Sequence, residues 1–189
     1  MRRIVSKLNP IRVAGVEDGS FHAEGFRHEK TLLIVILMKD MQLENFRSCT
    51  ITVDGLDATD KLLRTSRGIS ADVVMLSGVS FAGFNLVDPV KVNKKLGIPV
   101  IIVSRKKPDN VAVKNALMDH FKDWERRWAI IEKLGPIHMV TSKSGEPPIY
   151  IEVIGANLGW AKKITRRLSV ISKVPEPVRI ARLIAHGLT

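Results

Sequence analysis

The sequence has very little cysteine and no long apolar run. Cys49 is the one cysteine in 189 residues, which excludes an internal disulfide and a zinc site built from cysteines. The longest apolar run, residues 32–38, is far shorter than the roughly 20 residues that a membrane-spanning helix needs. No apolar segment follows the basic start of the chain, as a signal peptide would require. We therefore expect a single domain over residues 1–189 that is cytoplasmic and has no membrane partner.

The motifs of several common chemistries are also missing. The sequence contains no H-E-x-x-H, Walker A or G-x-G-x-x-G motif. Four histidines show no spacing typical of metal ligands: His22, His28, His120 and His138. These absences disfavour zinc chemistry, nucleoside triphosphate hydrolysis and dinucleotide binding.

Acidic residues are scarce relative to basic ones, with 19 Asp and Glu against 30 Lys and Arg and a net charge of +11. Residues 101–189 hold most of this excess, with 16 basic and 8 acidic side chains. A basic protein attracts polyanions through counterion release, so nucleic acid is the first partner to consider. A surplus that serves solubility, or the high lysine usage of a heat-adapted protein, would give the same count. Charge alone leaves these alternatives open.

The order of predicted elements indicates an α/β fold. Three strands come first, at residues 11–17, at 32–38 and in a segment ending at 53 with strict alternation, and they form an antiparallel meander. Helices that begin at Asp57, Asp88 and Asp109 then alternate with buried strands. Apolar steps of three and four residues predict that the helix after Asp109 continues to residue 131. Two weaker strands and two helices follow, at 137–141, 149–154, 156–168 and 177–186.

Three antiparallel strands followed by βαβ units predict a ribonuclease-H-like mixed sheet with helices on both faces. In such sheets the functional site lies at the carboxyl ends of the central strands. Two segments place residues there: GVEDG at 15–19 and SGVSFAGFN at 77–85.

Four acidic residues are candidates for a metal site at this edge. Glu17 and Asp18 end the first strand, and Asp54 and Asp57 lie in the run VDGLDATD. Carboxylates suit Mg²⁺ or Mn²⁺, and a two-metal hydrolase needs several of them to converge. A purely structural role is the alternative for each of them, because acids in turns accept hydrogen bonds from backbone amides and Asp57 stands where a helix N-cap is expected.

The Gly-rich loop carries candidates for contact with a nucleobase. Phe84 and Asn85 could stack on a base and hydrogen-bond to it. The alternative is that the loop phenylalanines, Phe81 and Phe84, pack as core, and we expect this of one of them. Ser77 begins the loop, but no G-x-S-x-G elbow surrounds it, so we reject it as a nucleophile.

Basic side chains suited to phosphate follow the next strand and lie on the last helix. Arg105, Lys106 and Lys107 come at a strand's carboxyl end, where cations can hold phosphates. Arg179 shares one stripe of the last helix with Arg182. Solvated basic surface is the alternative for both groups.

Five segments, in this order, resemble an archaeal family: RVAGVEDGSF, ITVDGLDATD, VVMLSGVSFAGFNLVDP, GIPVIIVSRKKPD and PEPVRIARLIAHG. The family was long catalogued as a domain of unknown function, is now called endonuclease dU, and is similar to endonuclease V. The resemblance covers nearly the whole chain. It implies a ribonuclease-H-like fold and a metal-dependent endonuclease of DNA repair that uses Mg²⁺ or Mn²⁺. The implied substrate is nucleic acid, DNA more than RNA, containing a deaminated base such as deoxyuridine.

The resemblance also implies roles for individual residues. Glu17 falls where these relatives usually have the metal-binding Asp of the first strand, and Asp54 is the nearest candidate for an intermediate carboxylate. Lys106 matches the lysine that lies near the substrate in endonuclease V. Ser77 falls where the family usually has an Asp, which implies weaker metal binding unless another acid compensates. The alternative functions are a nucleic-acid-binding protein of the same fold with weakened or lost catalysis, or a domain that is basic for solubility alone.

Overall fold

The computed structural model describes residues 10–21 and 29–189, so His22 and His28 lie outside the described residues. Within these ranges a seven-stranded sheet has the order β3-β2-β1-β4-β7-β9-β8. Its strands are β1 (Arg12–Asp18), β2 (Lys30–Lys39), β3 (Gln42–Thr52), β4 (Val73–Leu76), β7 (Val100–Ser104), β8 (His138–Val140) and β9 (Ile149–Ile154). A small hairpin, β5 (Ser80–Phe81) and β6 (Asn85–Leu86), forms within the Gly-rich loop. The helices are α1 (Ala58–Thr65), α2 (Pro89–Leu96), α3 (Asn110–His120), α4 (Trp124–Ile131), α5 (Leu158–Leu168) and α6 (Glu176–Gly187).

The strand directions bring the predicted site segments to one edge of the sheet. The antiparallel meander of β1, β2 and β3 is confirmed, and β4 is parallel to both β1 and β7. The carboxyl ends of β1, β3, β4 and β7 therefore meet at the same edge. On the far side β9 runs antiparallel to β7, and β8 is the edge strand.

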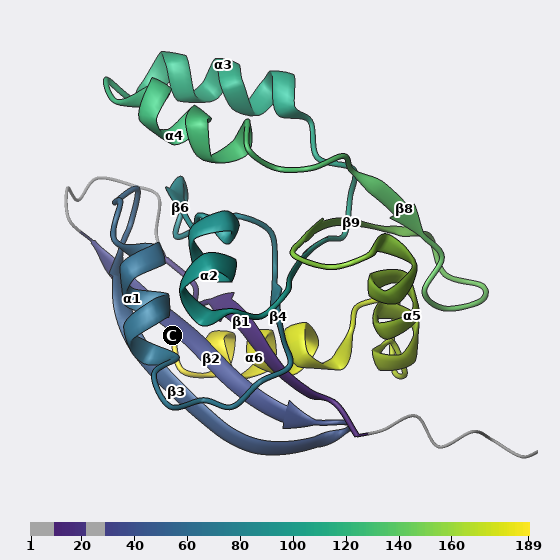
Figure 1. The fold of residues 1–189 in the computed structure, drawn as a ribbon. Coiled ribbons are helices and arrows are strands. Elements are labelled where there is room, and N and C mark those ends of the chain that lie inside the picture. The colour runs from purple at the N-terminus through teal and green to yellow at the C-terminus, as the bar shows by residue number, and fades with distance from the viewer. Residues whose placement is uncertain (1–9, 22–28) are drawn as a thin grey trace, which may run out of the picture.

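Helices cover both faces of the sheet, as predicted (Figure 1). On one face, Leu62 of α1 and Val92 of α2 pack on a core that includes Leu76 of β4. On the other face, Ile164 of α5 and Val178 of α6 pack on a second core. Successive strand residues supply the two cores alternately, because side chains of a strand point to opposite faces. In the described part of the chain, no helix has the length and apolar composition to cross a membrane.

The helix predicted from Asp109 to residue 131 is wrong in one respect, because it is two helices. Phe121 takes an extended conformation (φ −128°) and ends α3, and α4 starts three residues later. The apolar steps continue across the break because α3 and α4 fold back on each other around a small core of their own, which includes Leu117 and Ile131. Figure 1 shows this pair at the top, above the rest of the molecule.

Gly15 allows α6 to pack directly on β1. A Cβ atom at this position would lie 2.2 Å from the Pro177 carbonyl oxygen, in the first turn of α6. We expect Gly15→Ala to push α6 away and to lower the free energy of unfolding by about 1–3 kcal/mol. Denaturant melts measure this, with Gly187→Ala as a control because nothing lies within 4 Å of its added Cβ. Equal midpoints for Gly15→Ala and wild type would contradict the close packing.

Candidate active site at the carboxyl edge of the sheet

Glu17 is a buried carboxyl next to the end of β1, with 4% of its surface exposed. The Ser77 hydroxyl, just after β4, hydrogen-bonds to it. Its Oε2 atom is buried and has no hydrogen-bond partner among the described residues. Burial, and then the nearby Asp18 carboxylate, raises the pKa of Glu17 to about 7 against the opposing effects of Ser77 and Arg182. Glu17 is therefore a desolvated acid with one free oxygen and a cation nearby.

Asp18 follows Glu17 in β1, so its side chain points to the opposite face of the sheet. Its Oδ2 atom accepts a hydrogen bond from the Ala82 amide in the β5–β6 turn. Glu17 instead shares its face with Gly15, against which α6 packs. The two carboxyl groups nevertheless lie close enough for a side-chain hydrogen bond, which together with the Asp18 charge raises the pKa of Glu17.

Asp54 and Asp57 hold the loops of the site together. Asp54 has a positive φ of 54°, and its Oδ1 accepts a hydrogen bond from the Phe84 amide at 2.8 Å. Asp57 stands at the N-cap position of α1 but makes no capping bond there, which corrects the prediction. Its carboxylate accepts bonds from the Thr52 amide and hydroxyl at the end of β3 instead.

The predicted convergence of Glu17, Asp18, Asp54 and Asp57 on one metal site is not seen among the described residues, although Glu17 and Asp18 interact. Over residues 10–21 and 29–189, no three His, Cys, Asp or Glu side chains gather as a metal-binding group. The physical reason is that Asp54 and Asp57 accept hydrogen bonds from the Phe84 amide and from the Thr52 amide and hydroxyl, whereas Asp18 stays beside Glu17.

Asn85 is fully buried and serves the fold. Its Oδ1 accepts from the Ala58 amide at 2.9 Å, so Asn85 caps α1 in place of Asp57. Its Nδ2 donates to the Thr52 carbonyl and to Asp57 Oδ1. The prediction that Asn85 contacts a base is wrong, because its amide is enclosed and both ends have protein partners.

The two phenylalanines of the loop differ in burial, which confirms the prediction that one of them packs in the core. Phe81 is fully buried. Phe84 is half-buried and meets Phe121 edge-on, with ring centroids 5.4 Å apart and an interplanar angle of 70°. Phe84 also lines the cleft described below.

Arg127 joins these loops to the α3–α4 pair, and no motif in the sequence indicates this role. Its side chain is 4% exposed. The guanidinium donates to the carbonyl oxygens of Asp54, Gly55 and Phe84 at 2.9, 3.0 and 2.7 Å. It also pairs with Asp123 at 3.0 Å. One buried cation from α4 therefore fixes both loops.

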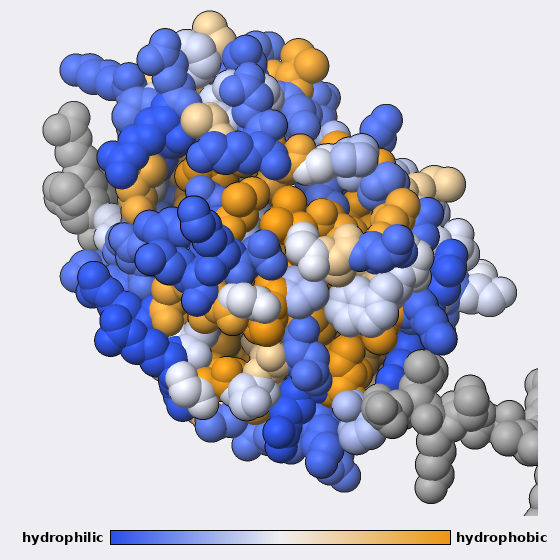
Figure 2. Space-filling view, viewed as in Figure 1, coloured by the Kyte–Doolittle hydropathy of each residue, from blue (hydrophilic) through white to orange (hydrophobic). Residues whose placement is uncertain are grey.

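A cleft of about 520 Å³ opens between the carboxyl ends of β4 and β7 and the α3–α4 pair. Its apolar lining includes Phe84, Leu86, Ile102, Val113 and Ile131, and its polar lining includes Ser77, Ser104, Arg105, Lys106, Lys107, Glu152 and Arg182. Figure 2 shows apolar side chains exposed below the α3–α4 pair among hydrophilic ones. An apolar hollow with a few convergent polar groups is the usual form of a ligand site.

The predicted basic turn after β7 lies at this cleft. Arg105, Lys106 and Lys107 are all exposed and all line it. Partial burial, and then the charge of Arg182, lowers the pKa of Arg105, whereas the charge of Glu17 raises it. Arg105, Arg182 and Glu17 are therefore close enough to influence one another electrostatically.

Arg179 forms an ion pair with the buried Glu176. Its Nη2 and Nε atoms lie 2.6 and 2.8 Å from Oε2 of Glu176, which is 2% exposed, and this hydrogen bonding raises the pKa of Arg179. Its predicted role in nucleic-acid contact is thus not supported by its surroundings. Arg182, three residues further along α6, is the cation of this helix that lines the cleft.

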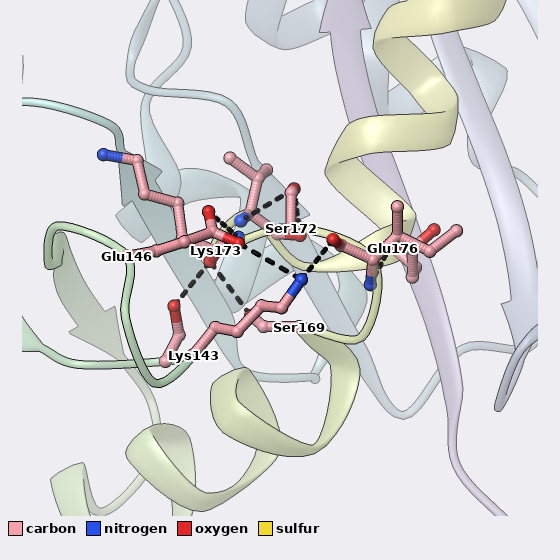
Figure 3. A network of polar contacts seen from close by, with 9 residues as sticks. Lys143, Glu146, Ser169, Ser172, Lys173 and Glu176 are labelled. Carbon is pink, nitrogen blue, oxygen red and sulfur yellow. Dashed lines mark hydrogen bonds and ion pairs between the residues drawn. The ribbon is translucent and has the colours of Figure 1, made fainter.

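A polar network fixes the start of α6 and so the position of Arg182 (Figure 3). Glu176 accepts a hydrogen bond from the Ile171 amide, and the Lys173 amide donates to Glu146 in the β8–β9 loop. Glu146 also pairs with Lys143 at 3.2 Å. The segment between α5 and α6 is thereby tied to the β8–β9 loop.

Glu152 is a second buried carboxyl, and no motif in the sequence indicates it. It lies in the middle of β9, pairs in register with Ile102 of β7, and is 5% exposed. Burial raises its pKa to about 7. The signal in the sequence was one acid inside the apolar run IYIEVI.

Glu152→Gln should stabilise the protein at alkaline pH. The unfolded chain ionises Glu152 near its ordinary pKa of 4.5 and the folded protein only near 7, so the carboxyl destabilises the fold as pH rises through this window. We expect the variant to be about 1–2 kcal/mol more stable than wild type at pH 8, since solvent in the cleft screens part of the effect. The gap should shrink towards pH 5. Urea melts at both pH values test this, with the exposed Glu125→Gln as control; a gap that does not change with pH would contradict it.

Comparison with known proteins identifies the family. A family model described as endonuclease dU matches residues 9–189. The chain belongs to the endonuclease dU family. A UPF0215 protein of Methanothermobacter thermautotrophicus is 38% identical over 184 residues, which cover 95% of this chain and 88% of that protein. A UPF0215 protein of Pyrococcus furiosus is 39% identical over 184 residues, covering 94% of this chain and 92% of that protein.

Solved structures show the same fold. A protein of unknown function from Archaeoglobus fulgidus is 32% identical, with a TM-score of 0.82 over 94% of this chain and 98% of that one. The catalytic domain of human endonuclease V is 14% identical, with a TM-score of 0.62 over 94% and 81% of the two chains. Endonuclease V of Ciona intestinalis, in complex with a DNA that contains inosine, is 13% identical with a TM-score of 0.59 over 92% and 83%. The ribonuclease-H-like fold predicted for this member of the endonuclease dU family is confirmed.

Proposed function

We propose that this protein is a metal-dependent endonuclease that cuts DNA containing a deaminated base such as deoxyuridine, in DNA repair. The observation that carries the proposal is Glu17, whose buried, unpartnered oxygen lies at the sheet edge occupied by the basic cleft. Family membership supports a nuclease, and the fold is shared with an endonuclease V whose structure contains inosine-bearing DNA.

The residues present fit a divalent cation that takes few ligands from the protein. Mg²⁺ is commonly held by one or two carboxylates together with substrate phosphates and water. Glu17 would hold the ion through its free oxygen, with the Ser77 hydroxyl beside it. When bound, Mg²⁺ or Mn²⁺ activates water and stabilises charge on the leaving oxygen.

The cations of the cleft would hold the DNA backbone. Lys106 and its neighbours Arg105 and Lys107 are exposed at the cleft, where they can contact phosphates on either side of the cut bond. Lys106 would stabilise the charge that develops on the reacting phosphate. Phe84 would stack against a base extruded into the cleft, a role supported by its half-buried ring.

A second function, nucleic-acid binding with weak or no cleavage, is favoured by one specific observation. The described residues bring no three potential metal ligands together, and Ser77 occupies the position next to Glu17. Such a protein would bind DNA in the presence of a chelator, with an affinity that falls steeply as salt rises.

A nicking assay separates the two functions. We expect wild type to nick a labelled duplex with one deoxyuridine when Mg²⁺ or Mn²⁺ is present, and to leave it intact with EDTA. Duplexes with one inosine or with no damaged base show whether cleavage is selective. Binding without nicking in either metal would favour the second function, and equal nicking of undamaged DNA would contradict the proposed substrate.

A further inference from the structure

Glu152 is an acid in the cleft that neither the metal site nor the basic turn explains. In β9 it pairs with Ile102 of β7, whose side chain belongs to the core beneath α1 and α2, and both residues line the cleft. Within the described residues, no hydrogen bond or ion pair reaches the Glu152 carboxyl. Glu152 is 5% exposed, yet its oxygens are not among the fully enclosed unpartnered atoms of the described residues, so the carboxyl reaches the cleft and is open to a ligand there.

The charged groups that line the cleft make no ion pair with Glu152 within the described residues. Among the described lining residues, the turn after β7 contributes Arg105, Lys106 and Lys107, and α6 contributes Arg182. None of these charges influences the pKa of Glu152, which burial alone raises. Tyr150 lies on the same face of β9, whereas His138 of β8 pairs with Ile151 and so shares the opposite face. The α3–α4 pair presents apolar side chains and Asn110 to the cleft.

A carboxyl in this setting takes the neutral form more readily than one in water, because burial disfavours charge. A neutral carboxylic acid offers one O–H donor and one C=O acceptor side by side. An N–H group next to a C=O group on a planar ring can pair with both at once. Uracil presents this edge at N3 and O4, and hypoxanthine presents it at N1 and O6.

We propose that Glu152, as a neutral acid, pairs with the N–H and C=O edge of a deaminated base that enters the cleft. This inference rests on the proposed function for the identity of the polymer and specifies how its damaged base is recognised. Phe84 offers an aromatic surface in the same cleft, and a volume of about 520 Å³ lies within the range of small-molecule pockets. Other bases present edges that a neutral acid can also pair with, so selection comes from extrusion: a uracil or hypoxanthine that is mismatched with its partner costs less to extrude than a well-paired base.

The proposal predicts a pH-dependent preference that a glutamine removes. Glutamine offers the same donor and acceptor without titrating. We expect wild type to bind a duplex with one deoxyuridine opposite dG at least ~10-fold more tightly at pH 6 than the undamaged duplex with dC at that position. Above pH 7 this preference should fall by up to about ten-fold per pH unit. Glu152→Gln should keep the preference from pH 6 to 8.5, and Glu152→Ala should lack it throughout.

Fluorescence anisotropy with EDTA measures these affinities without cleavage. The ratio of the two dissociation constants removes effects common to both duplexes, such as titration of Glu17. Glu125→Gln on the exposed surface of α4 is the matched control and should follow wild type. The isosteric Glu152→Gln decides the question even where Glu152→Ala folds poorly, and circular dichroism melts check both variants.

The outcomes separate this inference from the proposed function. A preference for deoxyuridine that is unchanged in Glu152→Ala, or one that varies with pH equally in wild type and Glu152→Gln, overturns the role of Glu152 and leaves the nuclease standing. A Glu152-dependent preference in a protein that nicks no DNA supports the inference and rejects the nuclease. Absence of any preference in wild type from pH 6 to 8.5 overturns base recognition by Glu152.

Discussion

Glu17→Ala is expected to reduce the metal-dependent nicking of deoxyuridine-containing DNA by about a hundred-fold or more, because losing even an outer-shell group of a metal site costs 10–100-fold. Glu17 is the one site carboxyl with a buried, unpartnered oxygen among the described residues. One carboxylate oxygen of each neighbouring acid is engaged by the Gly-rich loop, since Asp18 accepts from the Ala82 amide and Asp54 from the Phe84 amide.

Single-turnover nicking at several Mn²⁺ concentrations measures this loss. Glu17→Gln retains the shape of the side chain and loses the charge, so it should be about as defective as Glu17→Ala. Asp119→Asn, on the exposed surface of α3, is the control and should nick like wild type. DNA binding in EDTA should persist in both Glu17 variants, because removing an acid next to a basic cleft does not weaken its attraction for phosphate. Nicking by Glu17→Ala at the wild-type rate would exclude Glu17 from the metal site.

Arg127→Ala is expected to lower the free energy of unfolding by about 3–5 kcal/mol, since it deprives buried groups of a charged partner. Three backbone carbonyls and Asp123 lose their donor together. The guanidinium also lies over the Phe121 ring, 4.2 Å from its centroid, and this contact is lost as well. The turn at Asp54 and Gly55, the Gly-rich loop and the α3–α4 pair should therefore loosen as one unit.

Thermal and denaturant melts test the magnitude, and hydrogen exchange tests where the loosening occurs. The exposed neighbour Arg126→Ala is the matched control, because it removes the same charge from the same helix. Arg127→Lys should recover little, since an ammonium group lacks the planar fork that reaches several carbonyls. Equal stability of the Arg126 and Arg127 alanine variants would contradict the role of Arg127.

The sequence predicts the sheet well because the burial of strand faces produces regular patterns of apolar residues. Alternating residues at the end of β3 and the continuous apolar run of β2 are direct consequences of one or two buried faces. The break between α3 and α4 is not marked by any such pattern. Phe121 continues the apolar spacing and yet leaves the helix to pack on Phe84, a contact 37 positions away in the chain.

The candidate site is harder to predict from the sequence, because short polar side chains stabilise loops as often as they bind ligands. The residue types of Asp54, Asp57 and Asn85 suit ligands, but in the structure the two acids accept hydrogen bonds from backbone amides and Asn85 caps α1. Glu152 and Arg127 are informative because they are charged and buried. Burial of a single residue depends on the tertiary fold, which local sequence patterns do not report.

A crystal structure with an uncleaved deoxyuridine duplex and Mn²⁺, prepared with a non-hydrolysable phosphate, tests the account most directly. The account predicts anomalous density for Mn²⁺ at Glu17 and the uracil ring extruded into the cleft beside Phe84, with its N–H and C=O edge facing Glu152. Duplex bound to another face of the protein, with the uracil stacked and no metal at Glu17, would contradict it.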